Sequence, residues 1–167
     1  YLRNLWVTAD EHGRRDKALV YLEELDKISP EGYWTGNLAE AQEEREQWLA
    51  AAKTFERMWQ TNLAGAKASL LQNNAQNVTE VFRPVLLYRA GRAYEKVGEK
   101  DKGTRMTRQA RLLCLGDLDA RFSLARAMSE ADEEDLAHEE WELVARLSQP
   151  NDSLGMQTFN ILANELK

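Results

Sequence analysis

The chain has 167 residues, and its 28 acidic and 22 basic side chains give a formal net charge of −6. An acidic chain does not favour a surface that follows the phosphates of a nucleic acid. Cys114 is the single cysteine, which excludes an internal disulfide framework and a cysteine zinc cluster. No apolar run reaches the roughly 20 residues of a membrane span, so membrane insertion is not expected. Nine glycines and three prolines are few for a β-sandwich, which favours a helical protein.

The first predicted unit is a helical hairpin over residues 1–30. Gly13 marks the break between its helices, and the second helix opens on Asp16-Lys-Ala18. An acidic side chain at a helix start can accept hydrogen bonds from free backbone N–H groups. The small residue two positions later lets the two helices of a hairpin approach closely.

The second predicted hairpin covers residues 38–73. Its first helix carries the apolar segment 48–55, and its second helix opens at Asn62. We expect the first helix to extend backwards to a cap at Asn37, because Glu40 three residues later is typical of a capping box.

A rival division of this segment uses Ala39, Ala51 and Phe55 as the repeat positions. It requires a helix break between Glu43 and Gln47, where the sequence has neither glycine nor proline, and we reject it on that ground. The polar run 72–79 is then predicted to be a loop between the second and third hairpins.

The third and fourth hairpins, over residues 84–116 and 118–150, share one frame at a fixed period of 34 residues. Small residues, bulky residues and acidic helix starts recur in it at matching positions. The corresponding pairs are Gly91 and Ala125, Tyr94 and Met128, and Asp101 and Asp135. A terminal helix is predicted over residues 153–167.

Four second helices thus open on the pattern [Asp/Asn]-x-[Ala/Gly], and the best-matching first helices carry small residues followed by a bulky one. In these features the chain resembles the tetratricopeptide repeat (TPR) family. The resemblance implies an all-α fold, a TPR-like α-solenoid in which antiparallel helical hairpins stack into a right-handed superhelical array. It implies about four hairpins and a terminal helix within a single repeat domain over residues 1–167.

The resemblance also implies a concave groove that is lined by first helices and receives a segment of a partner. The groove positions hold apolar or aromatic residues, each followed one turn later by a polar, usually basic one. They are Leu49, Lys53, Tyr88, Arg92, Phe122, Arg126, Met156 and Asn160. Because arginine binds carboxylates bidentately, we expect a protein or peptide partner with acidic groups. In an alternative interpretation these arginines pair with Glu56, Glu95 or Glu130 and leave a solvated face.

No catalytic, cofactor or metal site is expected, and the chain is not predicted to be an enzyme. His12 and His138 are the only histidines, and neither has a second His or Cys at the spacing of metal ligands. The sequence contains no glycine-rich phosphate loop.

Charge is distributed unevenly along the chain. Residues 84–116 carry eight basic and three acidic side chains, and acidic residues dominate after them. Pairing between adjacent second helices is favoured over a nucleic-acid patch. The expected partners are Arg105 and Arg108 with Glu139 and Glu142.

The sequence therefore predicts a protein-interaction scaffold. Two alternatives stay open, namely a structural spacer or self-association segment of a larger repeat protein, and an accessory domain that presents substrates to a separate catalytic domain. Because the chain begins at Tyr1 without Met, we expect it to be part of a longer protein whose targeting signal would be missing. The cytoplasm is slightly favoured.

Overall fold

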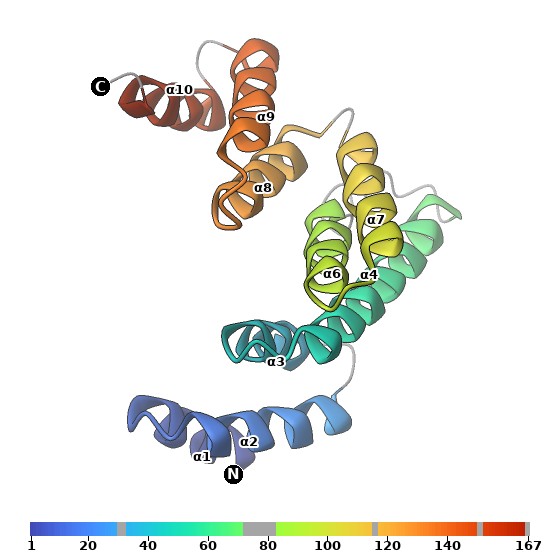
Figure 1. Ribbon diagram of the computed structural model, residues 1–167, viewed down its shortest axis with the longest axis vertical. Coiled ribbons are helices and arrows are strands. Elements are labelled where there is room, and N and C mark those ends of the chain that lie inside the picture. The colour runs from blue at the N-terminus through green and yellow to red at the C-terminus, as the bar shows by residue number, and fades with distance from the viewer. Residues whose placement is uncertain (30–32, 72–82, 115–116, 150–151, 166–167) are drawn as a thin grey trace.

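The computed structural model describes residues 1–29, 33–71, 83–114, 117–149 and 152–165. Every regular element in these ranges is a helix (Figure 1). The helices are α1 (Leu2–Glu11), α2 (Arg15–Ile28), α3 (Tyr33–Glu44), α4 (Trp48–Leu71), α6 (Pro84–Lys96), α7 (Lys100–Leu113), α8 (Leu118–Ser129), α9 (Glu134–Leu147) and α10 (Ser153–Glu165).

The helices pack as hairpins that stack along the long axis of the molecule (Figure 1). The pairs are α1 with α2, α3 with α4, α6 with α7, and α8 with α9, and α10 packs on α8 and α9. Neighbouring hairpins meet where α2 packs on α3, α4 on α6, and α6 on α8. The predicted all-α array of helical hairpins is thereby confirmed. None of the described helices is both long and apolar enough to cross a membrane.

A residue with positive φ lies two positions before the second helix of each hairpin. The four residues and their φ angles are Gly13 (65°), Glu46 (56°), Gly98 (90°) and Asp132 (60°). The left-handed region ends one helix and redirects the chain into the next. Gly13 and Glu46 are 33 positions apart, and Gly98 and Asp132 are 34 apart, whereas Glu46 and Gly98 are separated by 52. The extra length therefore lies between the second and third hairpins.

The division of the second hairpin predicted from the sequence is wrong. Helix α3 ends at Glu44 and α4 begins at Trp48, so the break falls in the segment for which we rejected it. Asn62, the expected start of a second helix, lies inside the 24-residue α4, and Asn37, the expected cap, lies inside α3. The break was missed because glutamate rarely adopts positive φ and gives no turn signal. The predicted loop 72–79 lies outside the described residues.

The acidic residues that open the second helices do not cap them. Asp16, Asp101 and Asp135 lie inside the first turn, and no side chain makes a capping hydrogen bond at the start of α2, α7 or α9. Their contribution is electrostatic, because a carboxylate in the first turn interacts favourably with the helix dipole.

The small residues bring the helices of a hairpin close together, as predicted. Gly91 on α6 and Gly103 on α7 face each other, and a Cβ built on Gly103 would lie 2.6 Å from the carbonyl oxygen of Gly91. Ala18 and Ala137 are likewise buried in their hairpins. One apolar core then runs from α3 to α10, and a smaller cluster joins α1, α2 and α3.

Candidate functional site

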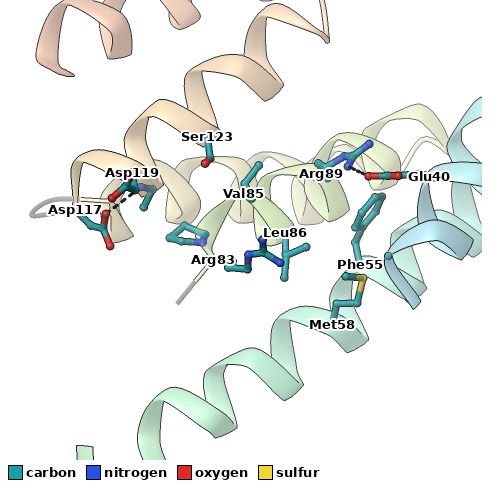
Figure 2. A pocket seen from close by; sticks show the side chains of 13 residues that line it. Glu40, Phe55, Met58, Arg83, Val85, Leu86, Arg89, Asp117, Asp119 and Ser123 are labelled. Atoms are coloured by element: carbon teal, nitrogen blue, oxygen red, sulfur yellow. Dashed lines mark hydrogen bonds and ion pairs between the residues drawn. The ribbon is translucent and has the colours of Figure 1, made fainter. Parts of the chain in front are cut away.

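A hollow of about 490 Å³ opens on the side of the array formed by first helices (Figure 2). Helices α3, α6 and α8 line it, together with the first half of α4. These are three successive first helices, which is where the resemblance places a binding groove. The volume falls within the range that is usual for ligand-binding pockets.

The floor of the hollow is apolar. Helix α4 supplies Phe55 and Met58, and the N-terminal turn of α6 supplies Pro84, Val85 and Leu86. Phe55 belongs to the core, with an exposed fraction of 1%, whereas Met58 and Val85 are only partly buried. The floor can therefore exchange water for apolar groups of a ligand without unpacking the core.

One end of the rim is formed by an arginine that is already paired. The guanidinium of Arg89 lies 4.7 Å from the centroid of the Phe55 ring. It also binds Glu40 at 3.3 Å and Glu43 at 2.5 Å, both on α3. Burial raises the pKa of the Glu43 carboxyl above its usual range, although Arg89 acts in the opposite direction. Arg89 is therefore held in place and largely neutralised.

The other end of the rim is formed by the start of α8 (Figure 2). Asp117 caps this helix, and its carboxylate accepts a hydrogen bond from the backbone N–H of Ala120 at 3.0 Å. Asp119 and Ser123 follow on the same face and are exposed. In the described part of the chain Asp119 makes no ion pair, so its carboxylate is available to a ligand.

Two of the predicted groove residues lie on a different kind of helix from the one expected. Leu49 and Lys53 belong to α4, the second helix of its hairpin, because the break at Glu46 precedes them. They do not line the hollow. Met156 and Asn160 lie on α10 and are exposed, far along the chain from the hollow.

The two aromatic groove candidates serve packing. Tyr88 has an exposed fraction of 2%, and its hydroxyl donates a hydrogen bond to Glu133 at 2.6 Å. Burial, together with this hydrogen bond, raises the pKa of Tyr88 above its usual range. The ring of Phe122 packs edge-on against Trp141 within its own hairpin, with centroids 4.9 Å apart.

The two arginines of the predicted groove are paired with glutamates. Arg92 binds Glu95 at 2.7 Å and Glu133 at 2.8 Å, and Arg126 binds Glu130 at 3.2 Å. The alternative interpretation named Glu95 and Glu130 as partners, and the structure confirms both. Both guanidinium groups are thus engaged by carboxylates of the chain itself.

The residues that do line the hollow stand three positions before the predicted ones. Val85 and Arg89 precede Tyr88 and Arg92 on α6 by three, and Asp119 and Ser123 precede Phe122 and Arg126 on α8 by the same number. They keep the 34-residue period, so the repeat was read correctly. Tyr88 and Arg92 line a separate, smaller hollow of about 110 Å³. The period does not say which of the two hollows binds a partner.

Shared carboxylates join neighbouring hairpins. Each carboxylate binds two side chains, at least one of them from a neighbouring hairpin. The sets are Asp26 with Thr35 and Arg57, Glu56 with Tyr94 and Lys102, Glu133 with Tyr88 and Arg92, and Glu140 with Arg111 and Arg121. Such contacts join each hairpin to its neighbour.

The predicted pairing of second helices occurs, but through another arginine. Arg111 on α7 binds Glu139 at 2.7 Å and Glu140 at 3.0 Å on α9. Arg105 and Arg108 make no ion pair within the described ranges. No group of His, Cys, Asp and Glu that could hold a metal ion occurs among the described residues.

No family model and no curated protein matches the chain. Similar solved structures include a putative kinesin light chain of Podosopora anserina with nearly identical TPR-like repeats, at 16% sequence identity and a TM-score of 0.47, covering 94% of this chain and 80% of that one. They also include MamA 41-end from Desulfovibrio magneticus RS-1, at 18% identity and a TM-score of 0.32, covering 91% and 96%. A further MamA crystal structure has 14% identity and a TM-score of 0.32, covering 87% and 88%.

The fold is established by the packing of the helices. Four hairpins stack in sequence, and α10 continues the array. The described part of the chain is thus an all-α array of stacked helical hairpins.

Proposed function

We propose that the chain is a non-enzymatic scaffold that binds a segment of a partner protein in the hollow between α3, α4, α6 and α8. The observation that carries this proposal is the hollow itself, with an apolar floor and a charged rim on the first-helix side of the array. An apolar surface with a few fixed polar groups at its edge is typical of a recognition site.

The support of the hollow also favours binding. Its rim arginine is fixed by two glutamates, and shared carboxylates join the neighbouring hairpins. A site that is already ordered loses little conformational entropy when a partner binds, so more of the contact energy appears as affinity.

Filling the hollow tests this function. Ser123→Trp places a large side chain at an exposed position on its wall, and Arg108→Trp adds the same side chain on the exposed face of α7, away from the hollow. We expect Ser123→Trp to abolish the recovery of partners in a pull-down and Arg108→Trp to preserve it, with equal helicity by circular dichroism. Equal recovery with both variants would exclude the hollow as the binding site.

Self-association is a second candidate, favoured by the exposed face of α10. Met156 and Phe159 lie one turn apart on this helix, and each has an exposed fraction of 60%. If copies associate through this face, the mass measured by sedimentation should increase with concentration, and Phe159→Ser should abolish the increase. A concentration-independent monomer mass in the wild type would exclude this candidate.

A further inference from the structure

The charged side chains around the hollow indicate which charge a ligand should carry. Three carboxylates line it, from Glu40, Asp117 and Asp119, against the guanidinium groups of Arg83 and Arg89. Arg89 is shared between Glu40 and Glu43, so it offers little positive charge to a ligand. Together with Glu43, which also binds Arg89, the four carboxylates outnumber the guanidinium groups of Arg83 and Arg89, so the rim is acidic overall. The arginine pattern in the sequence suggested the opposite.

The acidic charge is concentrated where α8 begins. Asp117 and Asp119 stand two positions apart there, and both line the hollow (Figure 2). Asp117 accepts the capping hydrogen bond from Ala120, whereas Asp119 is exposed and makes no ion pair in the described ranges. A cationic side chain that binds here gains a charge-assisted hydrogen bond, whereas a carboxylate would be repelled by both aspartates.

The apolar surface lies next to this charge. Val85, on the first turn of α6, belongs to the apolar floor and lines the same hollow as Asp119 and Ser123 on α8. Met58, on α4, is partly buried and extends the apolar surface away from the aspartates (Figure 2). A ligand that uses both features carries an apolar side chain beside a basic one.

We propose that the hollow binds a peptide segment in which a lysine or arginine stands next to an apolar residue. The basic side chain binds Asp119, and the apolar side chain packs on Val85 and Met58. This inference rests on the proposed function and adds the chemical class of the partner segment to it.

Selection from a random peptide library displayed on phage tests the inference, with the whole chain as bait. We expect the enriched peptides to carry Lys or Arg beside an apolar residue. Charge reversal by Asp119→Lys should lower the affinity for synthetic copies of these peptides by about three- to tenfold, since it replaces an exposed attraction with a repulsion. Higher ionic strength should weaken the wild-type complex as well.

A matched control is available in the next helix of the array. Asp135 occupies the second position of α9, as Asp119 does in α8, and it is also exposed. Asp135→Lys should therefore remove a first-turn carboxylate from α9, as Asp119→Lys does from α8, while leaving the affinity for the peptides unchanged. A decrease of equal size with both variants would show that the effect is not local, and would overturn the inference.

The remaining outcomes separate the partner chemistry from the function. Two outcomes would overturn the basic-partner inference and leave the proposed function standing. In the first, the peptides lose binding with Ser123→Trp but are acidic. In the second, they lose binding with Ser123→Trp but bind Asp119→Lys with the same affinity as the wild type. Peptides whose binding is insensitive to Ser123→Trp would overturn both.

Discussion

Replacing Gly103 with alanine should destabilise the protein, although alanine is the better helix former. The new Cβ would lie 2.6 Å from the carbonyl oxygen of Gly91 and 3.0 Å from the backbone nitrogen of Glu95, and it would overlap Cγ of Glu95. The Glu95 side chain can rotate away, but it would then lose its bonds to Arg92 and Thr104. The carbonyl of Gly91 belongs to the backbone of α6, so only separation of the two helices relieves that contact.

The magnitude follows from two opposing effects. Alanine in place of glycine inside a helix stabilises it by about 0.5–1 kcal/mol. Overpacking a tight contact costs about 1–3 kcal/mol. Because the contact at Gly103 involves backbone on both helices, we expect the upper part of this range and a net loss of about 1–2 kcal/mol in the free energy of unfolding.

Gly36 provides the matched control for this change. It lies in the first turns of α3, as Gly103 does in α7, and a Cβ built there meets only Cε of Met58, at the ordinary contact distance of 3.7 Å. Gly36→Ala should therefore stabilise the protein by about 0.5–1 kcal/mol. Urea unfolding followed by circular dichroism gives both values. A Gly103→Ala variant as stable as the wild type would refute the argument from close approach.

Three further predictions concern buried or paired groups. Glu140, with an exposed fraction of 2%, binds two arginines, so Glu140→Ala should lower the free energy of unfolding by about 3–5 kcal/mol. Burial raises the pKa of the fully buried Cys114 thiol to about 12, so this thiol should resist alkylation at pH 8 until urea unfolds the chain. Burial alone would raise the pKa of Glu56, but hydrogen bonds from Tyr94 and Lys102 outweigh it and lower the pKa below 4.5. Its ionised form is therefore favoured in the folded state, and this stability should be lost as the pH falls below about 4.5.

Each of these predictions has its own control. Glu139→Ala removes an exposed ion pair of the same arginine and should cost less than about 1 kcal/mol, so equal losses at Glu139 and Glu140 would contradict the role of burial. Alkylation of Cys114 at equal rates in the native and unfolded states would contradict its burial. Glu56→Gln should flatten the acid limb of the stability curve, and an unchanged acid limb would show that other carboxyl groups cause it.

Much of the fold could be predicted because its causes are local in sequence. Glycine adopts positive φ readily, and Gly13 and Gly98 accordingly marked their turns. Small residues at a fixed spacing predicted the close approach of α6 and α7, and the period of 34 residues aligned the last two hairpins. These signals depend on the intrinsic preferences of single residues, so they can be recognised in the sequence without a tertiary structure.

The second hairpin required the structure. Glu46 adopts positive φ in the turn between α3 and α4, which pack against each other, and glutamate has no intrinsic preference for this conformation. The same packing places Ala39 and Phe55 together in the core, in the division that the sequence led us to reject. Tertiary contacts here override a local preference.

The proposed binding surface is likewise determined by tertiary contacts. The sequence by itself determined a helical repeat scaffold and the positions that recur in it. Which face of α6 and α8 meets the core depends on the contacts of each helix with its neighbours, and these buried Tyr88 and exposed Asp119. The charge around the hollow followed from the same packing, because Glu43, which binds Arg89, and Glu133, which binds Arg92 beside Glu95, come from other hairpins. Pairing across such distances in sequence exists only in the folded chain.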